Sequence, residues 1–185
     1  MPAGSFAGDA SRIERLRAWA ERIRAESITG HLTPASMVQV DCGDDLSPAA
    51  AFSALGAEAS DIEEVAAASL GYLFSTRVMT RRYAEIAAWA ASGDPRGAIA
   101  NTVRNESATY PRPTPVAAFL DVPFLMEPAD IEQTIRGLLG APTFEDIHLV
   151  TASDGTRFLY SARHLEHRQA ASLAEWAAVG RANNP

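Results

Sequence analysis

The sequence predicts an α+β, mostly helical protein that contains two copies of one module. Three observations predict this fold class. Residues 61–93 resemble residues 146–180 in order and spacing, which indicates an internal repeat of roughly 80–87 residues. Segments with apolar residues at helical spacing fill most of each copy. Short segments in which apolar and polar residues alternate precede the last helix of each copy, and the turn Ser153-Asp154-Gly155 between two of them predicts a β-hairpin.

The repeat depends on identities that are unusual in an alanine-rich chain. Trp89 matches Trp176, and Tyr72–Arg77 and Phe158–Arg163 share the order aromatic–Leu–aromatic–Ser–x–Arg. The other polar and proline matches are Arg24/Arg104, Glu26/Glu106, Ser27/Ser107, Thr33/Thr114, Pro48/Pro128, Asp61/Asp146 and Arg82/Arg168. We therefore expect a flexible N-terminus over residues 1–10, one module over residues 11–95 and a second over residues 96–185.

Local signals predict each element of the first module. Residues 11–27 form a helix, Thr33-Pro34 starts a second helix, and Ser47-Pro48 starts a third that ends near residue 57. The run Met37–Val40 would also suit a strand, so the second element stays open between helix and strand. The apolar face of the first helix is expected to bury Ile13, Leu16, Ala20 and Ile23. A turn over residues 41–45, strands over 62–68 and 71–75, and a helix from Thr80 to about residue 91 complete the module.

The second module repeats this order. A helix is predicted over 98–108, an extended proline segment over 110–115 and a short helix over 114–121, which Pro123 ends. A further helix begins at Glu127-Pro128, strands follow at 147–151 and 157–161, and a closing helix covers 165–179. The residues expected to be buried are Ile131, Ile135, Leu138 and Leu139 in the former helix and Leu173, Trp176 and Val179 in the latter.

The order helix, short helix, turn, helix, β-hairpin, helix resembles the winged-helix fold, in which a two-stranded wing follows a helix-turn-helix. The matching features are the two Thr-Pro starts, Ser47-Pro48 and Glu127-Pro128, and the hairpins after them. The resemblance covers nearly the whole chain twice, although no motif indicates a specific family. An alternative is another duplicated α+β module.

The third helix of each module is poorly suited to reading DNA bases. In DNA-binding winged helices this helix enters the major groove and presents basic or amide groups. Residues 47–60 contain no Arg, Asn or Gln, and the corresponding helix of the second module sets Gln133 and Arg136 among acidic residues. The net charge of −7 further disfavours nucleic acid. Base reading is therefore not expected.

Arginines gather elsewhere, near the hairpins and the start of each closing helix. They are Arg77, Arg81, Arg82, Arg157, Arg163 and Arg168. One hypothesis is that they contact phosphate or a partner. The alternative is that they are solvated, with Arg77 and Arg163 each pairing to a nearby carboxylate in an equivalent structural role.

The polar set shared by the two modules is expected to be structural. Its members are Arg24, Glu26, Ser27, Arg104, Glu106 and Ser107. The arginine and glutamate of each triplet would pair at the end of a helix, and the serine would bond backbone there. No catalytic, cofactor-binding or metal residue is predicted, because His164 and His167 lack further ligands and the carboxylates around Cys42 disfavour a reactive thiolate.

These observations predict a non-enzymatic protein-binding or adaptor protein, with self-association as one form of that binding. The alternatives are a DNA-binding transcriptional regulator that uses the arginine clusters, and a small ligand-binding protein or enzyme with a pocket between the modules. One cysteine, no signal peptide and no long apolar stretch favour the bacterial cytoplasm, with no membrane insertion and no cofactor.

Overall fold

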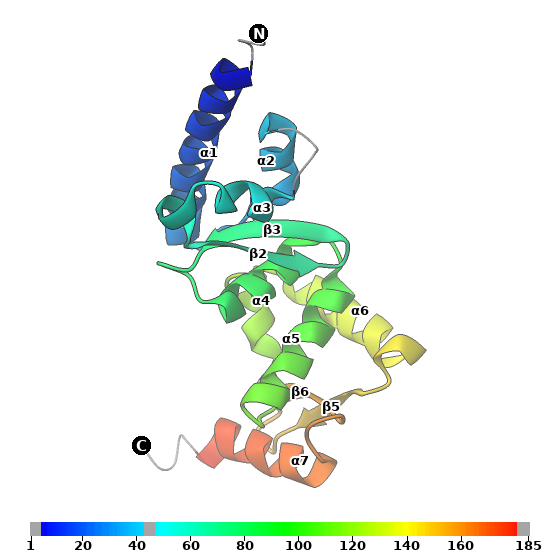
Figure 1. Ribbon diagram of the computed structural model, residues 1–185. Helices are drawn as coiled ribbons and strands as arrows, with labels where there is room; N and C mark the ends of the chain where they lie inside the picture. Colours follow the sequence, from blue (N-terminus) through cyan, green and yellow to red (C-terminus); the bar gives the residue numbers. More distant parts are fainter. Residues whose placement is uncertain (1–4, 43–46, 181–185) are drawn as a thin grey trace. The chain divides into compact units, whose positions relative to one another are not determined.

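The computed structural model describes residues 5–42 and 47–180, and its fold class is α+β and mostly helical, as the sequence predicts (Figure 1). The chain divides into two compact units, residues 1–92 and 93–185. Each unit contains, in order, a helix, a two-residue strand, three helical segments of which the last is a 3₁₀ turn, a β-hairpin and a closing helix. In the part of the chain that is described, no helix combines the length and apolarity needed to cross a membrane.

The first unit begins with a helix that is longer than predicted. Its elements are α1 (Ser5–Ile28), β1 (Thr33–Pro34), α2 (Ala35–Cys42), α3 (Pro48–Ser53), a 3₁₀ turn (Gly56–Ala59), β2 (Ile62–Ala67), β3 (Leu70–Ser75) and α4 (Arg81–Ala91). Helix α1 includes residues 5–10 of the predicted flexible terminus, and residues 1–4 lie outside the described residues. The predicted turn at 41–45 is described only at Asp41 and Cys42, which end α2.

The second unit repeats this order with a shorter second helical segment and a longer third helix. Its elements are α5 (Pro95–Thr109), β4 (Thr114–Pro115), a 3₁₀ helix η2 (Val116–Leu120), α6 (Pro128–Leu139), a 3₁₀ turn (Pro142–Phe144), β5 (Ile147–Thr151), β6 (Arg157–Ser161), α7 (His167–Glu175) and a π-helical turn (Trp176–Gly180). Ser47 and Thr80 each accept a backbone N–H bond at the start of a helix, as predicted. Asp94 caps α5 in the same way, which the sequence did not predict, since the helix was expected to begin at residue 98.

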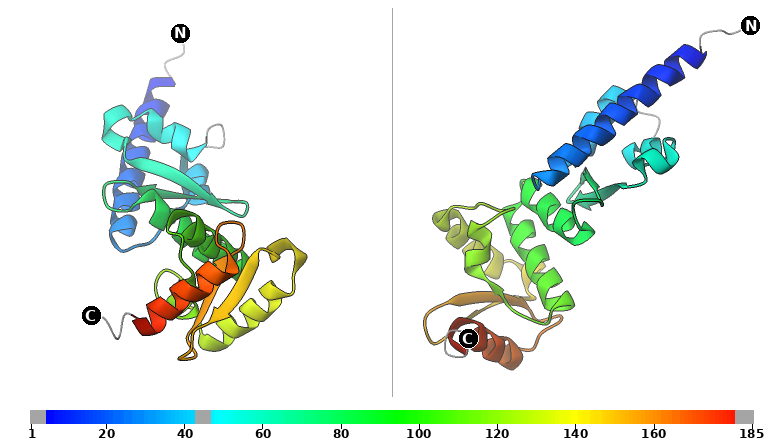
Figure 2. Two further views of the ribbon diagram at one scale, coloured as in Figure 1. Left: turned by 90° about the horizontal axis from the view of Figure 1, so that it is seen from below. Right: turned by 90° about the vertical axis from the view of Figure 1, so that its left-hand side faces the viewer.

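Each hairpin lies in a three-stranded antiparallel sheet whose third strand is the two-residue segment. The strand orders are β1-β3-β2 and β4-β6-β5, and Thr33 faces Leu73 where Thr114 faces Leu159. Successive residues of a strand point to opposite faces, so each sheet has a core on both sides. Leu159 is buried against α5, η2 and α6, while Phe158 and Tyr160 are buried against α7. Figure 2 shows the second hairpin between α5 and α7.

Tertiary pairing overrides the predicted role of the two Thr-Pro sequences. Thr33 and Thr114 are strand residues rather than helix caps, and α2 begins only after Pro34. The run Met37–Val40 lies in α2, so the alternative left open by the sequence is decided for helix. Val38 of this helix is fully buried in the core with residues of α1 and the sheet.

Several residues expected in the core lie at its margin. Ile13, Leu139 and Trp176 are exposed by 38%, 42% and 58% of their surface, and Leu173 and Val179 are half-buried. In α7 the fully buried positions are instead Ala170 and Ala174, because a small side chain lets the helix approach the sheet closely. Helical spacing correctly identified the side of each helix that faces the core. It predicted too wide a buried face, because residues at the margin of that face are exposed.

Thr114→Val is expected to stabilise the second unit by about 1 kcal/mol. The Thr114 hydroxyl is buried, and among the described residues it has no hydrogen-bond partner. An unsatisfied buried hydroxyl is unfavourable, and valine replaces it with a methyl group of the same shape. Thr33→Val should stabilise the first unit similarly, since the Thr33 hydroxyl is also buried and has no hydrogen-bond partner among the described residues. Urea unfolding measures the change, and Thr76→Val, which removes a hydroxyl bond to Asp61 O, should instead destabilise.

Candidate functional site

A buried carboxylate joins three elements of the first unit. Asp61, which precedes β2, accepts two bonds from the Arg24 guanidinium of α1, Nε to Oδ2 at 3.0 Å and Nη2 to Oδ1 at 2.6 Å. The Ser75 hydroxyl donates to Asp61 Oδ2 at 2.6 Å, and the Ser75 N–H donates to Ser27 Oγ at 3.0 Å. Arg77 Nη2 lies 3.2 Å from Asp61 Oδ1. The first helix is thereby tied to both strands of the hairpin.

The second unit repeats this arrangement atom for atom. Arg104 donates to both oxygens of Asp146 at 2.9 and 2.5 Å, and the Ser161 hydroxyl donates to Asp146 Oδ2 at 2.7 Å. The Ser161 N–H donates to Ser107 Oγ at 3.1 Å, and Arg163 Nη2 lies 3.3 Å from Asp146 Oδ1. Five polar identities of the sequence repeat therefore form one hydrogen-bonded network in each unit.

The shared polar set has a different pairing from the one predicted. Arg24 and Arg104 pair with Asp61 and Asp146, not with Glu26 and Glu106. Glu106 instead pairs with Arg112 at 2.8 Å, and the side chain of Glu26 is half-buried. Ser27 and Ser107 accept bonds from strand backbone far along the chain rather than ending their own helices. The prediction overlooked Asp61 and Asp146 as partners of these arginines, although the two aspartates are also a repeated identity.

The network stabilises the folded chain only while its carboxylates are ionised. Hydrogen bonds from Arg24, and secondarily from Ser75, lower the pKa of Asp61 from 3.8 to about 2 against the opposing effect of burial. Arg104 and Ser161 lower the pKa of Asp146 from 3.8 to about 2 in the same way. A carboxylate whose pKa is depressed by folding binds its proton more readily when unfolded, so acid favours unfolding.

We therefore expect the free energy of unfolding to fall as pH falls from about 4 to about 2. Each carboxylate contributes about 2 kcal/mol that is present above its unfolded pKa of 3.8 and lost as pH falls through its folded pKa of about 2. Urea titrations at pH 5, 4, 3 and 2 (about one-unit steps across this window) measure the slope. In the double variant Asp61→Asn/Asp146→Asn the slope should flatten, and an unchanged slope would contradict the assignment.

The arginines predicted as a phosphate or partner contact are largely engaged with carboxylates. Arg77 and Arg163 contact the network, Arg81 Nη1 lies 2.8 Å from Glu63 Oε2, and Arg157 forms a two-pronged pair with Glu132. The other two are Arg82, which is half-buried, and Arg168, which is exposed. Ion pairing reduces the positive potential that a phosphate-binding surface needs.

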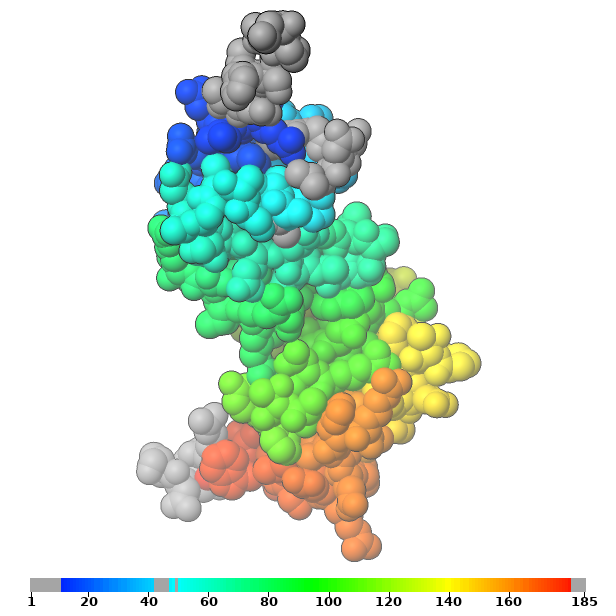
Figure 3. Space-filling view, in the orientation of Figure 1, coloured from blue at the N-terminus to red at the C-terminus, as the bar shows by residue number. Residues whose placement is uncertain are grey.

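An apolar groove lies on the second unit, beside the turn of its hairpin. It has a volume of about 310 Å³ and is lined by Val116, Ala117, Leu120, Pro128, Ile131, Glu132, Gly155, Thr156 and Arg157. These residues come from η2, the first turns of α6 and the β5–β6 turn. Figure 3 shows atoms of α6 in yellow and of the hairpin in orange at the surface of this unit. The Arg157–Glu132 pair connects the hairpin to α6 at the groove.

The loop that leaves the groove presents large aliphatic side chains to solvent. Leu120 is 43% exposed, and Val122 and Leu125 are each 67% exposed. We call these three residues the aliphatic loop surface. Its neighbours in sequence hold it: the Phe119 and Phe124 rings meet edge to face at 5.0 Å, and Met126 N–H donates to Phe119 O at 3.0 Å. The exposure is thus a property of an anchored loop.

The backbone of this loop adopts a conformation that leucine disfavours. Leu125 has φ +49°, in the left-handed region that side chains with a Cβ rarely occupy. Such conformations persist only where surrounding contacts enforce them, and they cluster at functional sites. Here the Leu125 N–H donates to Asp121 O at 3.0 Å, which closes the turn and directs Leu125 outward.

The residue that pairs with Glu132 at the groove differs between the two units. Leu73 and Leu159 occupy equivalent strand positions, so Arg157 corresponds to Gly71, two residues earlier in each case. A Cβ at Gly71 would require the flexible end of the Glu64 side chain to move aside. The two units therefore share the buried network but differ at this position, where the first unit has glycine and the second has arginine.

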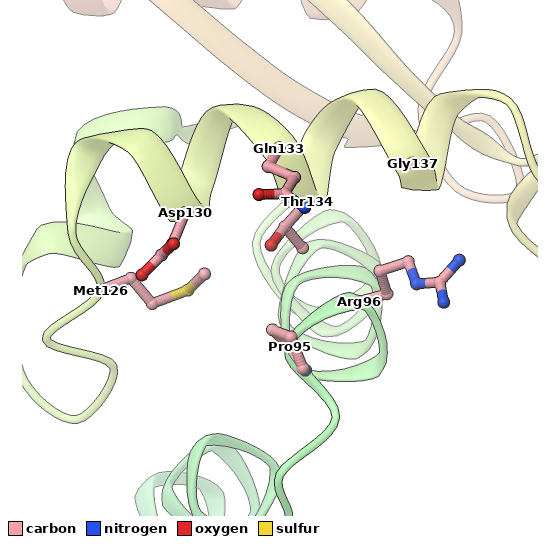
Figure 4. A pocket seen from close by; sticks show the side chains of 7 residues that line it. All are labelled: Pro95, Arg96, Met126, Asp130, Gln133, Thr134 and Gly137. Carbon is pink, nitrogen blue, oxygen red and sulfur yellow. The ribbon is translucent and has the colours of Figure 1, made fainter.

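A second, more polar hollow of about 610 Å³ lies between the start of α5 and α6 (Figure 4). Asp130 and Met126 lie at one end and Arg96 at the other, with Thr134 and Gln133 between them. Among the described residues, no three His, Cys, Asp or Glu side chains gather closely enough to hold a metal ion. His167 Nδ1 is 3.0 Å from the Tyr160 hydroxyl, and His164 is exposed.

Residues 93–182 match the profile of the YdhW C-terminal domain family. The second unit is similar to that domain. This match begins at the first residue of the unit and nearly fills it. The chain is also 36% identical over 114 residues to the uncharacterized protein YdhW of Escherichia coli K12. This matched region covers 62% of this chain and 53% of that protein. The chain thus spans about half the length of this relative. No solved structure matches this chain.

Proposed function

We propose that this chain is a non-enzymatic adaptor that binds another protein through the second unit. The contact comprises the aliphatic loop surface and the adjoining groove. The observation that carries this proposal is the exposure of Leu120, Val122 and Leu125 on a loop anchored by Phe119 and Phe124. Burying apolar area against a partner is favourable by about 25 cal/mol per Å², so exposed aliphatic side chains on an ordered loop favour association.

We further propose that each unit is a winged-helix-like module that has no DNA-reading role. The strand orders β1-β3-β2 and β4-β6-β5 and the hairpin after the third helix support the resemblance. The third helix of the second unit carries Asp130 and Glu132 on its exposed side, and such charges repel phosphates. The single Cys42 supports a reducing compartment, the bacterial cytoplasm, as the site of action.

Site-specific photo-crosslinking tests the proposed contact. A photoreactive amino acid at position 122 of the full chain, expressed in the native host, should give one discrete adduct. The same amino acid at Leu139, which is 42% exposed on α6 but does not line the groove, is the matched control. An adduct from position 122 alone supports the proposal. A protein that gives no adduct at 122 and sediments as a strict monomer would contradict it.

A further inference from the structure

We propose that the occupant of the groove is a basic segment of a partner protein that inserts one aliphatic or aromatic side chain. This inference rests on the proposed function, since it names the chemistry of the partner. Among the described residues that line the groove, five are apolar side chains: Val116, Ala117, Leu120, Pro128 and Ile131. Its volume of about 310 Å³ is at the lower end for ligand pockets, about 300–1,000 Å³. A single large side chain suits this space better than a cofactor does.

Acidic side chains stand next to the apolar ones in the chain. Asp121 follows Leu120, Glu127 precedes Pro128 and Glu132 follows Ile131, and all three carboxylates are exposed. Arg157 is the only basic residue among the described groove lining, and its two-pronged pair with Glu132 neutralises it. Glu127 stands at the N-cap of α6 but makes no capping hydrogen bond, so its carboxylate remains available to a partner. The paired Glu132 and Arg157 leave the lining itself neutral, whereas the exposed sequence neighbours Asp121 and Glu127 add negative charge next to the lining residues. This charge favours lysine or arginine beside the inserted side chain.

The groove and its loop are also preorganised for binding. Phe119 is fully buried, the Phe119–Phe124 contact fixes one end of the loop, and Asp121 O accepts N–H bonds from Phe124 and Leu125 at 2.9 and 3.0 Å. A rigid surface loses little conformational entropy when a partner docks. A short linear segment therefore gains measurable affinity from one anchor and a few charges.

Three short fluorescent peptides test this inference against the full chain. The first has a central Leu-Phe pair flanked by lysines, the second has serines in place of the pair, and the third has glutamates in place of the lysines. We expect the first to bind at least about tenfold more tightly than either of the others, and its affinity to fall as salt shortens the Debye length from about 30 Å at 0.01 M to about 8 Å at 0.15 M. Fluorescence anisotropy measures each dissociation constant.

Matched variants locate the binding. Leu120→Ser should weaken the first peptide about tenfold, whereas Leu139→Ser, an exposed leucine outside the groove, should leave its affinity unchanged. Asp121→Asn/Glu127→Gln should weaken it about fivefold and flatten the salt dependence, and Glu166→Gln, an exposed acid at the start of α7, is the charge control. Circular dichroism confirms that each variant is folded.

The outcomes separate this inference from the proposed function. Equal binding of the lysine and glutamate peptides, or equal losses from Leu120→Ser and Leu139→Ser, would overturn the inference. An adduct at position 122 that maps to an acidic or uncharged partner segment would overturn it while leaving the proposed function intact. An adduct with a second copy of this chain would also overturn the inference and leave the proposed function intact, unless the crosslinked segment is basic.

Discussion

Asp146→Asn is expected to destabilise the second unit by about 3 kcal/mol, among the largest effects of any single substitution in this chain. Asp146 is 6% exposed and accepts bonds from Arg104 and Ser161, so asparagine leaves the Arg104 guanidinium, only 20% exposed, without a carboxylate. Removing one partner of a buried ion pair costs about 3–5 kcal/mol, and the partial exposure of Arg104 places this case at the lower end. Amide hydrogen exchange of β5 and β6 reports the change for this unit by itself.

The duplication supplies an internal replicate and close controls. Asp61→Asn should cost the first unit a similar amount, because Arg24 and Ser75 repeat the contacts at nearly the same distances. Glu145→Gln, next in sequence to Asp146 but exposed, should change stability by less than about 0.5 kcal/mol. If Asp146→Asn proves as mild as Glu145→Gln, the network does not stabilise the unit.

Phe119→Ala is expected to cost about 3–5 kcal/mol and to release the loop that carries the aliphatic surface. Phe119 is fully buried in the core of the second unit and touches Phe124, which it would leave beside a cavity. Urea unfolding measures the loss of stability. Limited proteolysis within residues 120–126 measures the release of the loop, since cleavage requires local opening.

The exposed neighbour of Phe119 is the control for this prediction. Leu120→Ala should change stability by less than about 0.5 kcal/mol, because the side chain already contacts water. The two variants therefore separate folding from binding: Phe119→Ala should lose both, and Leu120→Ala only the contact with the partner. Resistance of residues 120–126 to protease in Phe119→Ala would show that other contacts hold the loop.

Local sequence signals predicted the elements well where backbone chemistry decides them. Ser47 and Thr80 cap helices as expected, because a side-chain oxygen one position before a helix satisfies a free N–H whatever surrounds it. The Ser153–Gly155 turn joins two paired strands, and Gly155 has φ +87°, which glycine adopts without strain. The candidate groove was not predicted, since its residues come from three segments that only packing brings together.

The sequence by itself determined the duplication, the α+β class and most element boundaries, because these depend on periodicity, caps and turns within short windows. It also contained every member of the buried network as a repeated identity. Only the tertiary structure decided that Arg24 and Arg104 pair with Asp61 and Asp146 rather than with the glutamates two positions away. The physical reason is that each aspartate is more than thirty residues away from its arginine in the chain, so only the folded structure brings the two together. The aspartate is buried there, and a buried charge is stable only beside its counterion.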